Sequence, residues 1–201
     1  GNTQATVSWS APSSNGGSPI TGYTVTASPG GQTVTVNGQT LTATFTSLTN
    51  GTSYTFTITA TNAKGNSAAS SASNAVTPAT IPGAPTYVTA TASSTQATVT
   101  WSAPSSTGGS TITGYEVTAN PSGQTVTVNG STYTATFTGL ANGTPYTFIV
   151  TTINTIGTGA SSSASNAVTP ATVPGAPTNV TAIAGNTQAT VSWSAPSSNG
   201  G

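Results

Sequence analysis

Hydrophobic residues alternate with threonine or serine along much of the chain. Residues 5–9 place alanine, valine and tryptophan at every second position, and residues 54–60 continue the pattern with tyrosine, phenylalanine, isoleucine and alanine. Similar runs occupy residues 23–27, 34–36 and 41–45. A period of two is typical of a strand with one buried face, and no segment shows the spacing of an amphipathic helix. The pattern therefore predicts an all-β chain of short strands.

Turn-forming residues separate these runs. An Asn-Gly pair at 37–38 lies between residues 34–36 and 41–45, and a second pair occupies 129–130. Asn-Gly tolerates the positive φ angles of a type I′ turn, so we expect a hairpin at each pair. Pro-Gly-Gly at 29–31 marks a further loop. Several short strands at close spacing predict an antiparallel sandwich.

The strand pattern repeats along the chain. TQATVSWSAPSS begins at position 3, returns with one change at position 95 and returns unchanged at position 187, so the spacing is 92 residues each time. A unit of this length is too long for a solenoid repeat and matches one small domain with its own core. We therefore expect each unit to fold by itself.

The chain is almost uncharged. Lys64 and Glu116 are the only charged side chains, whereas about a quarter of the residues in an ordinary domain are charged. Because 33% of the residues are hydrophobic, we expect the chain to fold. Without a basic patch it cannot neutralise several phosphates, and it has no apolar run of about 20 residues. We therefore expect no nucleic-acid partner and no membrane insertion.

The inventory of side chains argues against catalysis. Histidine, cysteine and methionine are absent, which removes the commonest general base, the thiolate nucleophile and the usual zinc and haem ligands. The many serines lack an activating base. Lys64 and Glu116 lie in different units without a charged counterpart in the other copy, so we interpret them as isolated solvated charges. We predict no enzyme activity and no catalytic, cofactor-binding or metal-binding residue.

The motif residues of each unit resemble a fibronectin type III domain. A tryptophan in VSWSAP or VTWSAP precedes a tyrosine in ITGYTV or ITGYEV, a tyrosine corner in LTNGTSY or LANGTPY follows, and SNAVTP resembles the last strand. The motif residues are Trp9, Trp101, Trp193, Tyr23, Tyr115, Leu48, Gly51, Tyr54, Leu140, Gly143 and Tyr146. The resemblance implies tandem immunoglobulin-like antiparallel β-sandwiches. Because the tryptophans and tyrosines lie on alternating strands, we expect them in the core rather than in a sugar-stacking platform.

The resemblance also concerns the origin of the chain. PGAPTNVTA and SPITGYTVTASPGG are typical of bacterial versions, which occur in secreted and cell-surface proteins as enzyme spacers or long surface arrays. The loop that carries Arg-Gly-Asp in a vertebrate member has NAKGNS in the first unit and NTIGTGAS in the second. Integrin binding through that motif is therefore not carried over.

Proline-rich joints divide the chain into five parts. Prolines restrict themselves and the preceding residue to extended conformations, so we expect short, semi-rigid linkers. The predicted parts are a domain lacking its first strand at 1–76, a linker at 77–84, a complete domain at 85–168, a linker at 169–176 and the first two strands of a third domain at 177–201.

The sequence GNTQATVSWSAPSSNGG occupies residues 1–17 and returns at 185–201. We expect neither end to be a natural domain boundary. In one explanation, the tail of each chain donates a strand to the head of the next. However, the tail also carries a second-strand copy, 188–194, that competes with 4–10 of the head. We therefore favour the other explanation, that the chain is a piece of a longer array.

Four asparagines match the N-glycosylation pattern Asn-x-Ser/Thr, namely Asn50, Asn129, Asn142 and Asn179. Three of them belong to Asn-Gly turns, where backbone geometry already explains the asparagine. We also hypothesise that O-linked sugar covers the threonine-rich faces.

Few lysines and prolines guard the edges of the predicted sheets, so lateral association is easy. We therefore predict a non-catalytic extracellular structural protein, part of a self-associating surface filament or an adhesive stalk. A spacer array of a secreted carbohydrate-active enzyme is the alternative. A cell-surface or glycan partner bound through the loops is a further hypothesis.

Overall fold

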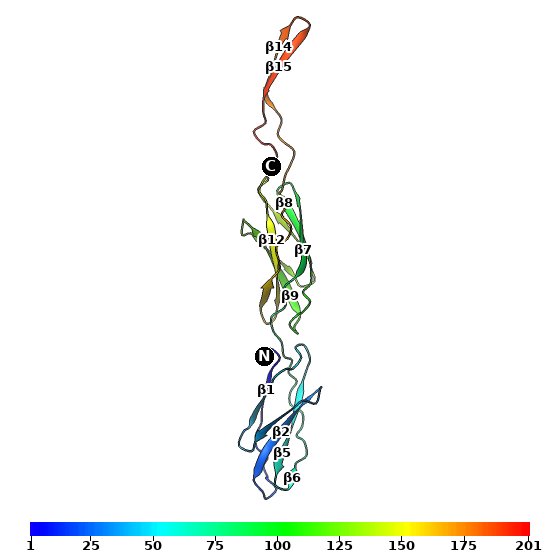
Figure 1. The fold of residues 1–201 in the computed structure, drawn as a ribbon, viewed down its shortest axis with the longest axis vertical. Coiled ribbons are helices and arrows are strands. Elements are labelled where there is room, and N and C mark those ends of the chain that lie inside the picture. Colours follow the sequence, from blue (N-terminus) through cyan, green and yellow to red (C-terminus); the bar gives the residue numbers. More distant parts are fainter. The chain divides into compact units, whose positions relative to one another are not determined.

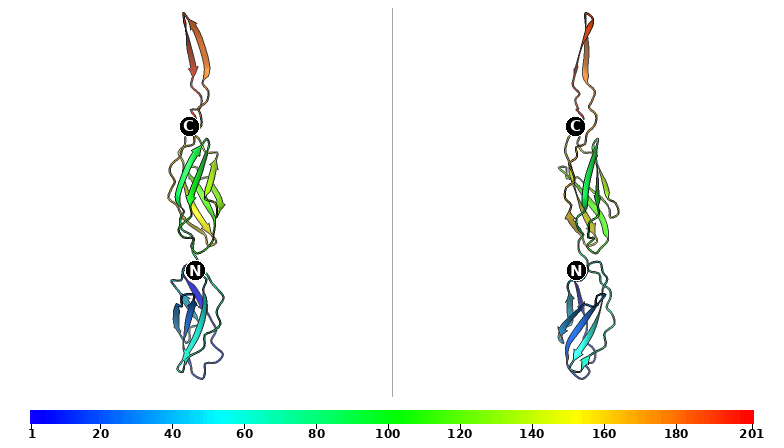
Figure 2. Two further views of the ribbon diagram at one scale, coloured as in Figure 1. Left: turned by 90° about the vertical axis from the view of Figure 1, so that its right-hand side faces the viewer. Right: turned by 45° about the vertical axis from the view of Figure 1, so that its right-hand side comes forward.

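The computed structural model describes all 201 residues, which form strands and loops without a helix. The chain divides into two compact units. The first comprises residues 1–82, 106–111 and 154–157, and the second comprises 83–105, 112–153 and 158–201. Figure 1 and the two views of Figure 2 show antiparallel strands in both units. The all-β prediction is confirmed.

The first unit contains a β-sandwich of six strands. They are β1 (Ala5–Ser8), β2 (Ile20–Ser28), β3 (Thr33–Asn37), β4 (Thr42–Phe45), β5 (Thr55–Asn62) and β6 (Gly65–Asn66). One sheet has the order β3-β2-β5-β6, and the other contains only β1 and β4. Phe45 and Phe56 meet between the two sheets with ring centroids 4.8 Å apart, and Val25 beside them is fully buried.

The second unit contains a sandwich of seven strands and a separate hairpin. The sandwich strands are β7 (Thr86–Ser93), β8 (Gln96–Ser102), β9 (Ile112–Asn120), β10 (Thr125–Asn129), β11 (Thr134–Thr138), β12 (Thr147–Asn154) and β13 (Thr158–Ser161). Its sheets have the orders β11-β8-β7 and β10-β9-β12-β13. Val99, Tyr115, Phe137 and Phe148 form its core and have no exposed surface.

The hairpin consists of β14 (Thr178–Gly185) and β15 (Gln188–Ser194), drawn in orange and red in Figure 1. The two strands form a sheet of their own, and every residue in them is exposed. Trp193 is 62% exposed, so it is not a core residue in this structure, contrary to the expectation for all three tryptophans. The reason is that residues 177–201 offer no second sheet against which the indole could pack.

The predicted Asn-Gly hairpins are wrong. β3 pairs with β2 and β4 pairs with β1, so the chain crosses from one sheet to the other after Asn37. Asn37 accepts the amide N–H of Thr40 at 3.0 Å through its side chain. Gly38 has no positive φ, and it is required because a Cβ there would overlap the carbonyl oxygen of Ile20. The same crossing occurs between β10 and β11.

The predicted last strand is replaced by a ladder of serines. In the first unit each of three serines donates its N–H to the carbonyl of a β5 residue, and its hydroxyl accepts the N–H of that same residue. The pairs are Ser67 with Ala60, Ser70 with Ile58 and Ser73 with Phe56. Each step of three residues in this segment spans only two residues of β5, so no regular strand forms. SNAVTP contributes only an isolated bridge between Tyr54 and Val76.

Both tyrosine corners are present. The hydroxyl of Tyr54 accepts the backbone N–H of Thr49 at 3.1 Å, and that of Tyr146 accepts the N–H of Ala141 at 3.1 Å. Both tyrosines are buried, and the hydrogen bond of each hydroxyl ties the loop to the sandwich. The chain forms no helix with the length and apolar character that a membrane crossing requires.

Candidate functional site

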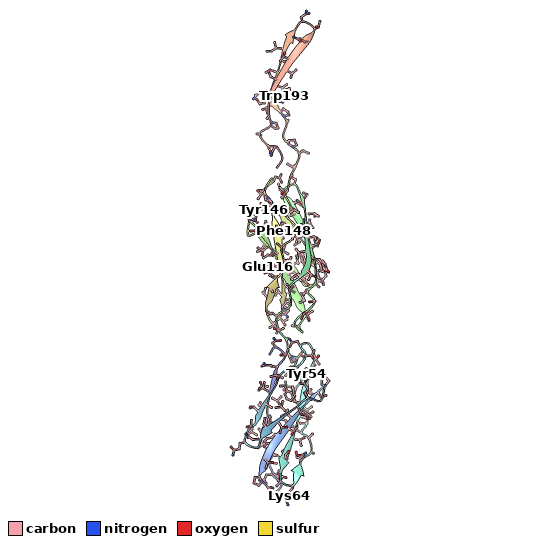
Figure 3. All side chains as sticks on the ribbon, in the orientation of Figure 1. Tyr54, Lys64, Glu116, Tyr146, Phe148 and Trp193 are labelled. Atoms are coloured by element: carbon pink, nitrogen blue, oxygen red, sulfur yellow. The ribbon has the colours of Figure 1, made fainter.

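The two charged side chains lie in different units (Figure 3). Lys64 is exposed in the loop between β5 and β6, and Glu116 is exposed on β9. Neither side chain therefore has a neighbouring acid or base with which it could share a proton. The prediction that the chain has no catalytic residue rests on this placement and on the absence of histidine and cysteine.

The buried aromatic side chains pack on one another inside the sandwiches. Trp9 meets Tyr23 edge-on with centroids 5.4 Å apart, and Trp101 meets Tyr115 at 5.5 Å. Tyr115 has no exposed surface, and its burial, with a smaller contribution from the neighbouring Tyr133, raises its pKa from 10.0 to about 12. These rings stabilise the core, and Tyr23, Trp101 and Tyr115 are buried from a sugar, whereas Trp9 is partly exposed.

The asparagines of the four glycosylation matches have structural contacts. Asn50 accepts the backbone N–H of Thr3 at 2.8 Å, and Asn142 accepts that of Thr95 at 2.9 Å. Asn50 thus ties its loop to the residues just before β1, and Asn142 ties its loop to the residues just before β8. The remaining pair, Asn129 and Asn179, is exposed, and their amides bond Ser131 and Ser194.

An open sheet edge distinguishes the first sandwich. In the second sandwich β8 lies between β11 and β7, and Ala90 of β7 is buried against the core. In the first sandwich β1 pairs with β4 alone, so its other edge has no neighbouring strand. Four residues of β1, Ala5–Ser8, therefore present backbone groups along an unpaired edge.

Asn74 of the first unit lacks the hydrogen-bond partner that Asn166 has in the second. Asn166 accepts the N–H of Ala90 at 2.9 Å and donates to the carbonyl of Ala90 at 3.0 Å, so it clamps β7 onto the sandwich. Asn74 occupies the same place in the first unit, 92 residues earlier. Its side chain is exposed and makes no hydrogen bond.

A hollow of about 360 Å³ lies at one end of the first sandwich. Its walls come from the loop around Gly16 and from the end of β5. Asn62 lines it and donates one amide hydrogen to the carbonyl of Asn15 at 2.8 Å, while its amide oxygen accepts the N–H of Lys64 at 2.8 Å. The second amide hydrogen of Asn62 has no acceptor.

The equivalent positions 92 residues later are filled. Loop residues 106–111 and 154–157 belong to the same compact unit as the linker, and Thr80 donates its N–H to the carbonyl of Gly108 at 2.8 Å. Asn154 donates to the carbonyls of both Thr80 and Thr107 at 2.9 Å. Asn154 is 4% exposed, so the linker covers an asparagine whose counterpart Asn62 remains partly open.

Comparison with known proteins identifies the fold. The family model of the fibronectin type III domain matches residues 1–76 and 83–168. The chain belongs to this family. A crystal structure of the FN1–FN3 domains of chicken CNTN1 is similar at 25% identity over 96% of this chain and 71% of that one, with a TM-score of 0.50. A two-domain fibronectin type III segment of chicken tenascin gives 20% identity over 84% and 93%, with a TM-score of 0.44.

No curated protein sequence matches the chain. Fibronectin type III domains are generally non-enzymatic and are typically extracellular or on cell surfaces, and domains in tandem suggest a structural or adhesive role. The bacterial, secreted origin stays a prediction. The sequence predicts that the first domain lacks its first strand, but it does not predict the hollow around Asn62 or the unpartnered Asn74. The Asn-x-x-Gly and Ser-Asn-Ala-Val repeats at these positions were the available signal.

Proposed function

We propose that this fibronectin type III chain is a non-catalytic segment of an extracellular structural array, and that it self-associates into a surface filament or adhesive stalk. The open edges of β3 and β10, which end the two four-stranded sheets, are the observation that carries this proposal. An unpaired strand edge presents a row of N–H and C=O groups that another strand can pair with. Because both strands have the uncharged sequence TVTVN, none of their side chains repels an incoming strand.

The near absence of charge supports the same conclusion. With one lysine and one glutamate, association has almost no repulsion to overcome and little for salt to screen. An array outside the cell would therefore keep its contacts when the ionic strength changes. A spacer array of a carbohydrate-active enzyme, by contrast, would need no contact between copies.

Sedimentation velocity and electron microscopy of the whole chain test the proposal. We expect the average mass to grow with protein concentration and to change little between low and high salt. A chain that stays monomeric at every concentration would contradict self-association and favour the spacer.

A lysine on the edge strand provides the matched variant. Thr35→Lys together with Thr127→Lys places a charge on the exposed face of β3 and of β10, and such lysines oppose edge-to-edge pairing. Thr100→Lys is the control, because Thr100 is exposed on β8, which already has a neighbouring strand on each side. We expect the double lysine variant to reduce assembly and Thr100→Lys to leave it nearly unchanged.

A further inference from the structure

The four-stranded sheet of each sandwich ends in a short strand of the same sequence. β3 and β10 are both TVTVN, and each pairs with a single neighbour, β2 or β9. These two strands are the TVTVN edges. We propose that the TVTVN edge of one copy of this chain pairs antiparallel with the TVTVN edge of a second copy, around a two-fold axis at the central threonine. This inference rests on the proposed self-association and names its contact.

Every second residue of β3 directs its backbone groups away from the sandwich. Gly38, just beyond the end of β3, donates its N–H to the carbonyl of Thr21. Hydrogen-bonded pairs alternate along an antiparallel ladder, so the even-numbered residues of β3 bond to β2. The N–H and C=O groups of Thr33, Thr35 and Asn37 therefore face the open side of the strand.

The backbone of β10 has the same orientation. Gln124, just before β10, accepts the N–H of Ala119 through its carbonyl at 2.9 Å. By the same alternation, the odd-numbered residues of β10 direct their backbone groups outward, with Thr127 at the centre. The odd-numbered residues are also exposed in both strands. Both TVTVN edges thus offer a row of unpaired groups to another strand.

The position of the two-fold axis follows from the length of the edge. Thr35 is the middle residue of β3, so an axis there pairs all five residues of the strand, whereas an axis at any other residue pairs fewer. Thr35 then exchanges two hydrogen bonds with Thr35 of the second copy, because both residues direct their backbone groups outward. At each end, Thr33 lies opposite Asn37. Both copies contribute the same patch, as a two-fold interface requires.

The side chains also match in this register. Val34 lies opposite Val36 of the second copy on the face that packs against the core, and both valines are only partly buried in one copy. Pairing brings these β-branched side chains together and removes part of their surface from water. Val126 and Val128 of β10 have the same partial burial against the second core. No charged side chain opposes the contact at either edge.

The serine ladder closes the opposite end of each four-stranded sheet. The hydroxyls of Ser67, Ser70 and Ser73 each donate to the carbonyl of the next residue at 2.8 Å, so these carbonyls already have a donor. Ser162 and Ser165 make the same contact in the second unit. The three-residue spacing of the serines also does not match the two-residue spacing of an incoming strand. Each four-stranded sheet therefore accepts one neighbour, and growth of the sheet stops when two of them have joined.

Cysteine cross-linking tests the register, because the chain has no cysteine of its own. One variant carries both Thr35→Cys and Thr127→Cys, so that either edge can report the contact. The proposed register places the central residues opposite each other as a hydrogen-bonded pair, with Cα atoms about 5.5 Å apart and within disulfide range. We expect oxidation of the assembled variant to link separate chains covalently, as measured on a denaturing gel.

The matched control carries Thr33→Cys and Thr125→Cys. Both residues are exposed on the same edges, two positions from the central threonine. In the antiparallel register the two control cysteines lie on opposite sides of the axis, four residues apart along the strands. This separation is about 13 Å, which exceeds the range of a disulfide. We expect almost no cross-linking of the control, whereas a parallel pairing in register would cross-link both variants equally.

Proline variants test the backbone contact independently. Thr35→Pro together with Thr127→Pro removes two outward N–H groups that the sandwiches do not use, and edge strands tolerate proline at such positions. We expect this change to raise the concentration for half-assembly about thirtyfold, the effect of losing two neutral hydrogen bonds. Sedimentation velocity measures the shift, and thermal unfolding checks that the variant is folded.

Thr44→Pro together with Thr136→Pro is the control for the proline variant. Thr44 is exposed on β4, the edge strand of the other sheet in the first sandwich. Because Trp9 donates its N–H to the carbonyl of Leu41 at 3.1 Å, the same alternation directs the N–H of Thr44 away from β1. Thr136 has the corresponding place on β11. We expect this control to leave assembly nearly unchanged.

The outcomes separate this inference from the proposed function. If the chain assembles but the central cysteines cross-link no more than the control, or the two proline variants weaken assembly equally, the edge pairing is overturned and self-association stands. A chain that remains monomeric overturns both. Selective cross-linking of the central cysteines, together with a selective effect of the edge prolines, supports the pairing. Where a proline variant does not fold, the cysteine comparison decides.

Discussion

Side chains on β1 of the first sandwich are less buried than those on β8 of the second, although the two strands are nearly identical in sequence. Val99 of β8 has no exposed surface, whereas Val7 of β1 is 8% exposed. Trp101 is 5% exposed, and Trp9 is only partly buried. The difference arises because β7 covers one edge of β8 and nothing covers that edge of β1. The comparison teaches that alternation selects the buried face of a strand, and that the neighbouring strand completes its burial.

Removing the tryptophan from each sandwich should give the largest difference in stability between the two sandwiches. Trp101→Ala should destabilise the second sandwich by about 3–5 kcal/mol, the usual cost of deleting a buried aromatic ring. Trp9→Ala should cost clearly less, because Trp9 keeps contact with water. Denaturant unfolding of the two variants measures the difference. Equal losses would contradict the role assigned to the covering strand.

Alkaline pH should act on the second sandwich through Tyr115. Its pKa is about 12 in the folded state and 10.0 when unperturbed. The folded state thus keeps its proton to higher pH, so this stabilisation is complete below pH 10 and declines as the pH rises toward 12. The loss should reach about 2.3 kcal/mol at pH 12.

Tyr115→Phe is the variant that isolates this effect. Phenylalanine keeps the ring but cannot ionise, so the stability of the variant should depend less on pH above 10. Thermal unfolding between pH 8 and 12 compares the two proteins. An unchanged pH profile in the variant would assign the alkaline loss to other tyrosines.

The asparagine clamp should give the smallest difference. Asn166→Ala removes two hydrogen bonds to Ala90 and should cost about 2 kcal/mol, about 1 kcal/mol for each bond. Asn74→Ala should change the stability of the unassembled chain by less than about 0.5 kcal/mol, because its amide has no partner there. Hydrogen exchange at the amide of Ala90 reports directly on the clamp. Comparable losses in the two variants would show that Asn74 already acts in the monomer.

Local patterns predicted the strands well, because alternation acts within one strand. Residues 5–8 and 55–62 form strands where threonine alternates with apolar residues. The tyrosine corners were also predictable, since Tyr54 and Thr49, whose N–H its hydroxyl accepts, are only five residues apart. The candidate site was harder to predict. Asn62 and Asn74 stand out only when they are compared with Asn154 and Asn166, whose side chains have additional hydrogen-bond partners.

Which segments pair with one another depended on backbone groups that are far apart in the chain. The Asn-Gly pair at 37–38 has the composition of a hairpin, but the backbone of Ile20 approaches Gly38 so closely that it becomes a crossing between sheets. Ser67, Ser70 and Ser73 recur at every third residue, and only their contact with β5 shows that their hydroxyls replace a regular ladder.

The sequence by itself determined the repeat, the all-β fold, the absence of charge and the buried faces of most strands, because each follows from short-range periodicity or composition. Only the tertiary structure decided which strands became neighbours, which edge stayed open and which asparagines found partners. The physical reason is that strand pairing joins backbone groups, which are alike at every residue, so its outcome depends on the whole sandwich.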